Sequence, residues 1–82
     1  MKHLNGIRDL IPFLDYLKDR KVSFHLSHDR HDSVTVTVMI LRERIEIEFF
    51  DDHIEYSRFT GDESVLSDQA VLFGLIEDFV RE

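Results

Sequence analysis

Between Val22 and Tyr56, apolar residues return at every second position in four separate runs. A period of two is the pattern of a strand with one buried side, because successive side chains point to opposite faces. The gaps between the runs are short and polar, so neighbouring runs should pair as hairpins in an antiparallel meander. The predicted buried positions are Val22, Phe24 and Leu26; Val34, Val36, Val38 and Ile40; Ile45, Ile47 and Phe49; and Ile54 and Tyr56.

The two flanking segments have the period of a helix instead. Apolar residues recur at spacings of three and four over residues 4–17 and again over residues 71–79, where Ser67 is the predicted N-cap. Pro12 cannot continue a helix interior, so the first helix either begins near Leu10 and Ile11 or kinks at the proline. The sequence therefore predicts one α+β domain over residues 1–82. Its expected architecture is a two-layer sandwich in the order helix, four-stranded antiparallel meander, helix, with both helices on one sheet face.

Composition excludes several classes of protein. The 82 residues contain no Cys, so a disulfide scaffold, a thiolate nucleophile and a Cys-based metal site are excluded. The longest apolar stretch, residues 70–76, is far shorter than a membrane span, and no signal-peptide run is found, so we expect a cytoplasmic protein with no membrane contact. The formal net charge of -7 disfavours binding to nucleic acid or an anionic membrane.

The acidity is concentrated in the second half of the chain. Residues 1–45 carry eight Lys and Arg against six Asp and Glu, whereas residues 46–82 carry two against eleven. A concentrated negative field speeds the encounter with a basic protein and repels acidic ones. A basic protein is therefore the expected partner, and the alternative is that the charge serves only to keep a small domain in solution.

A strand register follows from requiring that apolar residues share a face. The expected hairpin tips are Asp29 to His31, Arg42-Glu43 and Asp51-Asp52. This register places Glu48 directly opposite Glu55, where like charges destabilise a sheet. The expected pairs are Phe24 with Val36, Leu26 with Val34, Val36 with Phe49, Val38 with Ile47, Ile47 with Tyr56, and Phe49 with Ile54.

The sheet face that no helix covers mixes carboxylates with apolar side chains, including Met39 and Leu41. Such a mixture is typical of an interaction surface, with apolar anchors and charged groups that set specificity. The alternative is that the glutamates are simply solvated and that the apolar residues cover the end of the sheet. The predicted binding residues are Arg44, Glu46, Glu48, Phe50, Asp51, Asp52, Glu55 and Phe59.

His25, His28 and His31, together with Asp29 and Asp32, have the residue types of a metal site. Positions three apart on a strand point to opposite faces, however, so a solvated polar hairpin is the favoured interpretation. The sequence has no Gly-rich phosphate loop, no HExxH and no GxSxG motif, and no serine has a basic partner at motif spacing. No cofactor, metal site or catalytic residue is predicted.

Residues 44–52 and 53–59 resemble a group of small bacterial proteins, mostly without an assigned function. An Arg-led strand, an acidic turn and a Glu-containing strand ending in Arg-Phe recur in that group, and here they are Arg44, Asp51-Asp52, Glu55 and Arg58-Phe59. Some members resemble immunity proteins, the acidic antidotes that bind and block a toxin. The resemblance implies an antidote role for this chain.

The combined expectation is a non-enzymatic, acidic protein-interaction module that binds a basic protein. The first alternative is a self-associating structural module, such as a homodimer formed through the uncovered sheet face or the open strand edges. The second alternative is a small enzyme or metal protein that uses the histidines.

Overall fold

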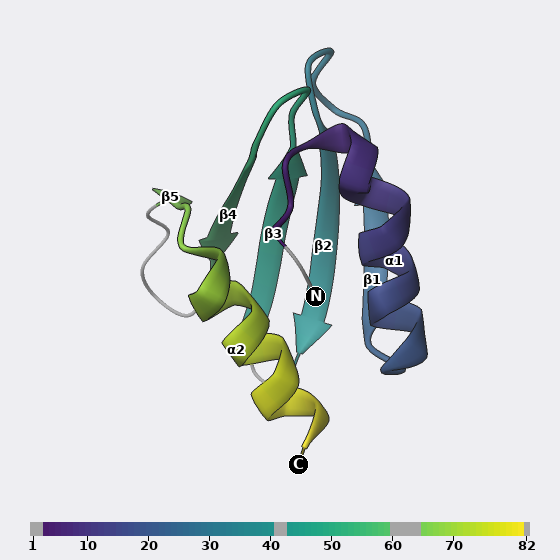
Figure 1. Ribbon diagram of the computed structural model, residues 1–82, viewed down its shortest axis with the longest axis vertical. Helices are drawn as coiled ribbons and strands as arrows, with labels where there is room; N and C mark the ends of the chain where they lie inside the picture. Colours follow the sequence, from purple (N-terminus) through teal and green to yellow (C-terminus); the bar gives the residue numbers. More distant parts are fainter. Residues whose placement is uncertain (1–2, 41–42, 60–64, 82) are drawn as a thin grey trace.

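The protein is an α+β domain of two helices and a five-stranded antiparallel sheet (Figure 1). The structure, a computed structural model, describes residues 3–40, 43–59 and 65–81. In chain order the elements are a short 3-10 helix η1 (Ile7–Asp9), α1 (Leu10–Asp19), β1 (Ser23–Ser27), β2 (Val34–Ile40), β3 (Glu43–Phe49), β4 (Ile54–Arg58), β5 (Val65–Leu66) and α2 (Gln69–Val80).

The strands follow one another across the sheet in chain order, from β1 to β5. The two helices and the antiparallel sheet are as predicted, but the prediction of four strands is wrong. β5 adds a short fifth strand, in which Leu66 pairs with Tyr56 and Val65 pairs with Ser57. Two residues are too few to show an alternation, so the pattern of the sequence did not reveal it.

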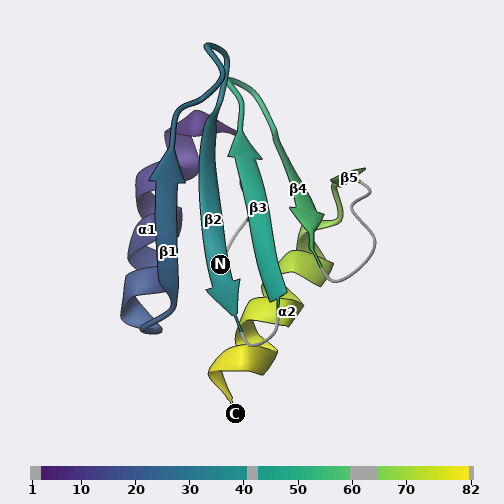
Figure 2. The ribbon, with the colours of Figure 1, turned by 180° about the vertical axis from the view of Figure 1, so that it is seen from behind.

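Both helices lie against the same face of the sheet. In Figure 1 they stand in front of the strands, and in Figure 2, the view from behind, the strands stand in front of them. α1 lies along β1, and α2 crosses the other half of the sheet. Within the described residues, the opposite face carries no helix.

The core fills the space between these layers. Phe13 of α1 lies at its centre, with ring centroids 5.6 Å from Phe49 of β3 and 6.1 Å from Phe73 of α2. Burying a side chain of this size contributes about 1.5–3 kcal/mol. The buried apolar residues are Leu4, Phe13, Leu14, Tyr16, Leu17, Val22, Val36, Val38, Ile45, Ile47, Phe49, Ile54, Tyr56, Leu72 and Ile76.

The helix starts refine the sequence expectations. α1 begins at Leu10, so Pro12 is its third residue, where a missing N–H removes no hydrogen bond of the helix. The N-cap of α2 is Asp68 and not the predicted Ser67. The Asp68 carboxylate accepts hydrogen bonds from the backbone N–H groups of Ala70 at 3.0 Å and Val71 at 3.4 Å.

The strand register is as predicted for one hairpin and wrong by two residues for the other two. Between β3 and β4, Phe49 pairs with Ile54 and Ile47 with Tyr56, around the predicted Asp51-Asp52 tip. Elsewhere the observed pairs replace the predicted ones: Val38 with Ile45, Val36 with Ile47, Val34 with Phe49, Phe24 with Val38 and Leu26 with Val36. A shift of two keeps every side chain on its face, so the apolar pattern could not detect it.

The shifted register also changes the predicted hairpin tips. Glu43, expected at the second tip, is instead the first residue of β3, and Arg42 lies outside the described residues. The first hairpin loop spans residues 28–33, because β1 ends at Ser27 and β2 begins at Val34. This loop is longer than the predicted tip, Asp29 to His31.

A cluster of three polar side chains ties α1 to α2. The Tyr16 hydroxyl donates a hydrogen bond to the Glu77 carboxylate, and Arg20 Nε lies 2.7 Å from Glu77 Oε2. The Arg20 guanidinium carbon also stands 3.9 Å from the centroid of the Tyr16 ring. Burial of the Tyr16 hydroxyl and its bond to Glu77 raise the pKa of Tyr16, and the same bond lowers the pKa of Glu77.

The segment before η1 is fixed to both α2 and the β3–β4 turn. The backbone of Leu4 makes two hydrogen bonds with the Gln69 side chain, of 2.7 Å from its N–H and 2.8 Å to its carbonyl oxygen. Gly6 has a φ of 126°, and an added Cβ would lie 2.6 Å from the carbonyl oxygen of Asp51. Ile7 then donates its N–H to the carbonyl oxygen of Phe50 at 2.7 Å.

Candidate functional site

The candidate site is the side of the sheet that points away from the helices, which we call the uncovered face. Its side chains alternate along each strand with the core residues. Met39 and Val65 are apolar residues on it that stay 49% and 64% exposed. The uncovered face consists of Ser23, His25 and Ser27 of β1, Thr35, Thr37 and Met39 of β2, Arg44, Glu46 and Glu48 of β3, Glu55 and Ser57 of β4, and Val65 of β5.

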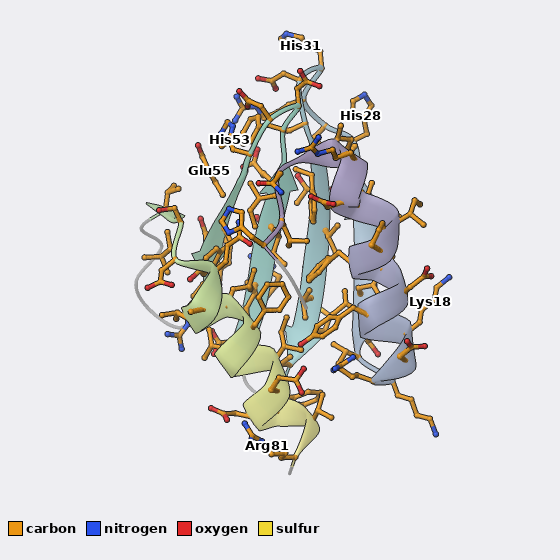
Figure 3. All side chains as sticks on the ribbon, viewed as in Figure 1. Lys18, His28, His31, His53, Glu55 and Arg81 are labelled. Carbon is orange, nitrogen blue, oxygen red and sulfur yellow. The ribbon has the colours of Figure 1, made fainter. Side chains whose placement is uncertain are left out.

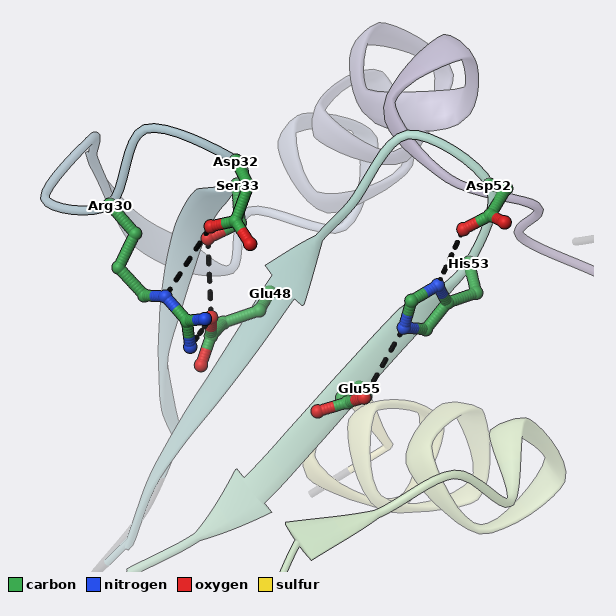
Figure 4. A network of polar contacts seen from close by, with 7 residues as sticks. All are labelled: Arg30, Asp32, Ser33, Glu48, Asp52, His53 and Glu55. Carbon is green, nitrogen blue, oxygen red and sulfur yellow. Dashed lines mark hydrogen bonds and ion pairs between the residues drawn. The ribbon is translucent and has the colours of Figure 1, made fainter.

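Glu48 and Glu55 lie directly opposite each other, as the sequence predicts. Figure 4 shows that each carboxylate has its own cationic or polar neighbour: Arg30 Nη1 lies 3.5 Å from Glu48 Oε2, and His53 Nε2 lies 3.2 Å from Glu55 Oε2. The Ser33 hydroxyl donates a further hydrogen bond to Glu48 at 3.2 Å. These contacts offset the like-charge repulsion that the sequence alone implies, which is worth about 0.2–1 kcal/mol.

Arg30 is a site residue that sequence reasoning missed. It belongs to the loop of residues 28–33, whose extra length carries it over the face toward Glu48. Its guanidinium also lies 3.4 Å from Asp32 and, on its carbon atom, 5.7 Å from the centroid of the Phe50 ring. The observed register of β1 and β2 is the signal that locates it, and the apolar pattern did not provide that register.

Phe50 and His53 form a stacked pair in the turn between the end of β3 and the start of β4. Their ring centroids are 4.6 Å apart with an interplanar angle of 8°. His53 Nδ1 lies 2.7 Å from Asp52 Oδ1. The hydrogen bonds to Asp52 and Glu55 raise the pKa of His53, and the bond from His53 lowers the pKa of Asp52.

A hollow of about 380 Å³ opens beside this stacked pair. Apolar side chains and polar groups both line it, and Figure 3 shows His28 and His31 at this end of the molecule, with Arg81 at the opposite end. Phe50 therefore belongs both to the edge of the uncovered face and to the wall of the hollow. The lining residues are Ile7, His28, His31, Asp32, Ser33, Val34, Phe49, Phe50 and Asp51.

Arg44 and Phe59 lie together at the other end of the sheet. The Arg44 guanidinium carbon is 4.5 Å from the centroid of the Phe59 ring, and Arg44 Nε is 3.5 Å from Glu46 Oε2. Phe59 also donates its backbone N–H to the Arg44 carbonyl oxygen at 2.9 Å. Phe59 is half-buried in this arrangement, so Arg44 shields part of the predicted anchor. Leu41, predicted beside it, lies outside the described residues.

The predicted binding residues therefore form a stripe and not a compact cluster. Phe50, Asp51 and Asp52 mark one end of β3, and Arg44 with Phe59 marks the other, about 20 Å away at the rise of a strand. The three glutamates lie between the ends. A stripe of this length suits an extended contact with a macromolecule better than a small-molecule site.

The three histidines considered as metal ligands are held apart by their local structure. His25 lies on the uncovered face of β1, whereas His28 Nδ1 is 2.9 Å from the Ser33 carbonyl oxygen in the loop. His31 is exposed. Within residues 3–40, 43–59 and 65–81, no group of three or more His, Cys, Asp or Glu side chains is placed to hold a metal ion.

Comparisons with models of protein families, with curated proteins and with solved structures give no match for this chain. Over the part of the chain that the structure describes, no helix combines the length and the apolar character needed to cross a membrane. The case for a function therefore depends on the geometry and charge of the uncovered face.

Proposed function

We propose that this chain is a non-enzymatic interaction module that binds a basic protein through the uncovered face. One observation carries the proposal. Glu46, Glu48 and Glu55 keep 38%, 31% and 42% of their side chains exposed on a face that no helix of the described residues covers. Exposed apolar residues lie on the same face, and protein interfaces combine these two kinds of contact.

The ion pairs on this face leave its carboxylates available to a partner. Arg44 and Arg30 each approach a glutamate only to 3.5 Å, and their side chains are themselves 49% and 60% exposed. Surface pairs of this kind contribute about 0–1 kcal/mol, so a cation from another protein can replace them. The chain's net charge of -7 adds long-range attraction for such a partner.

The resemblance of residues 44–59 to immunity-like bacterial proteins suggests a narrower form of this proposal. In that form the basic partner is a toxin, and this chain is the antidote that covers part of its surface. Complementary charge would then set the rate of capture, which must be fast for an antidote to protect a cell.

The experiment compares two triple variants that lose the same number of charges. Each variant and the unaltered chain serve as bait, and captured proteins are identified by mass spectrometry, purified and measured by calorimetry at low and high salt. The face variant is Glu46→Gln, Glu48→Gln and Glu55→Gln, and the matched control is Asp15→Asn, Asp19→Asn and Asp78→Asn, on exposed positions of the helices.

We expect to capture a basic protein whose affinity for this chain falls by about tenfold or more in the face variant and by less than about twofold in the control. Affinity should also fall as salt rises, because screening weakens the attraction. Equal losses in the two variants would show that net charge alone acts, and a partner that binds both variants unchanged would exclude the uncovered face.

A further inference from the structure

His53 lies in the turn before β4, and each of its ring nitrogens faces a carboxylate oxygen (Figure 4). Nδ1 is 2.7 Å from Asp52 Oδ1, and Nε2 is 3.2 Å from Glu55 Oε2. An ionised carboxylate can only accept hydrogen bonds, so each ring nitrogen must carry a proton to donate one. Only the imidazolium form of histidine has both protons. The two contacts are therefore made together only while His53 is positively charged.

The Phe50 ring fixes the plane in which His53 makes these contacts. The two rings are stacked, with centroids 4.6 Å apart and an interplanar angle of 8°. The face of an aromatic ring attracts a cation, so this stack stabilises the charged form of His53. The hydrogen bonds to Asp52 and Glu55 act in the same direction and raise the pKa of His53.

We propose that His53 is an internal cation that occupies Glu55 while it is protonated and releases this carboxylate to a partner when the proton leaves. Neutral histidine has one N–H and one bare nitrogen, and the hydrogen bond at one nitrogen decides the state of the other. The contact with Asp52 is the shorter one, so the remaining proton stays on Nδ1. The lone pair of Nε2 then faces the negatively charged Glu55 carboxylate, and that contact is lost.

Glu55 differs from the other two glutamates of the uncovered face in the cation beside it. Glu46 and Glu48 each lie near an arginine, which stays charged, whereas the ion partner of Glu55 within the described residues is His53. A titrating cation therefore controls one carboxylate of the row and leaves the other two unaffected. The charged and titratable groups around His53 and Glu55 are Asp52 in the turn, Glu48 and Arg30 across the uncovered face, and His3, which lines the same hollow of about 320 Å³.

The consequence for binding rests on the proposed function, because the partner that gains from a free Glu55 is a basic protein. A lysine or arginine of that protein competes with the His53 proton for the carboxylate. Affinity should therefore be lower at pH values below the pKa of His53 and should rise as pH increases through it. By linkage, binding of the partner also lowers the pKa of His53. One surface ion pair corresponds to a change in affinity of up to about fivefold.

NMR of the free chain tests the release of Glu55 without any partner. Between about pH 5.5 and about pH 9, the carboxyl carbon signal of Glu55 should shift with the same midpoint as the His53 ring, whereas that of Glu46, which lies beside Arg44, should not. Above this midpoint the ring nitrogen signals should place the remaining proton on Nδ1. A Glu55 signal that does not follow the His53 titration, or a proton on Nε2, would overturn the proposal.

A lysine decapeptide, whose side chains stay charged over this pH range, is the probe of binding. Calorimetry should show that it binds the chain about twofold to fivefold more tightly at about pH 8.5 than at about pH 5.5. His53→Gln should remove most of this difference, whereas His25→Gln, the matched control on the same face, should keep it. Equal effects of the two variants would show that overall charge acts, and would overturn the proposal. A decapeptide that does not bind, or that binds the triple face variant equally well, would count against the proposed function instead, and the NMR result would still decide the release of Glu55.

Discussion

Replacing Tyr16 by Phe removes the hydroxyl that joins α1 to the Glu77 carboxylate of α2. Losing a hydrogen bond to a charged group costs about 1.5–3 kcal/mol when the group is left buried without a partner. Glu77 is 36% exposed at its side chain and keeps Arg20 at 2.7 Å, so water and the guanidinium offset part of that cost. We expect the free energy of unfolding to fall by about 1 kcal/mol, which lowers Tm by about 4–8 °C in a domain of this size.

The effect should depend on pH. The hydrogen bond from Tyr16 and the contact with Arg20 lower the pKa of Glu77 in the folded state below its unfolded value of 4.5. The stabilisation is therefore present above pH 4.5 and is lost as pH falls through the folded pKa. Tyr16→Phe should therefore lower the free energy of unfolding by its full amount at pH 7 and by progressively less in acid.

Tyr56→Phe is the matched control. Its hydroxyl donates to the backbone carbonyl oxygen of Asp68 at 2.6 Å, an acceptor that carries no titrating charge. Its removal should cost about 0.5–1.5 kcal/mol at every pH. Urea unfolding followed by circular dichroism between pH 7 and strong acid measures both variants. A loss for Tyr16→Phe that is as large in acid as at pH 7 would refute an acceptor role for the Glu77 carboxylate.

Three further predictions concern Gly6, His53 and Glu48. Gly6→Ala should lower the free energy of unfolding by about 2 kcal/mol or more, because φ is 126° and the new Cβ would lie 2.6 Å from a backbone oxygen. Gly74→Ala, with open space around the new Cβ, should raise it by about 0.5–1 kcal/mol, and thermal melts measure both variants. In an NMR titration His53 should show a pKa above its ordinary value of 6.5, and Asp52→Asn should lower it; an unchanged midpoint would exclude the carboxylate as the cause. Glu48→Gln should change stability by less than about 0.5 kcal/mol, since relief of repulsion and loss of the arginine contact are of similar size, and a clear gain would show that repulsion dominates.

The apolar pattern could predict which residues face the core but not every register. Val38 was expected opposite Ile47 and lies opposite Ile45, because a slip of two residues leaves each side chain on the same face. The β3–β4 hairpin could be placed correctly because the adjacent turn formers Asp51-Asp52 separate its two apolar runs. In the β2–β3 hairpin the predicted and the observed registers both leave two residues between the paired strand ends, so neither the apolar pattern nor the loop length distinguishes them.

The candidate site could likewise be predicted only in part from the sequence. The row of Glu48 and Glu55 follows from the register of one hairpin, so the sequence contains enough information to predict it. The groups that offset its charge come from loops: Arg30 and Ser33 from residues 28–33, and His53 from the β3–β4 turn. Periodicity says nothing about where a loop side chain points, so these contacts emerge only in three dimensions.

The hydrogen bonds between Leu4 and Gln69 have a consequence for how the molecule folds. They join positions 65 residues apart, whereas the β3–β4 hairpin joins neighbours in the chain. Closing a long loop costs more conformational entropy than closing a short one, so contacts at large separation form after the hairpins. The segment before η1 should therefore dock last during folding and detach first during unfolding, and its amide protons should exchange with solvent sooner than those of β2 and β3.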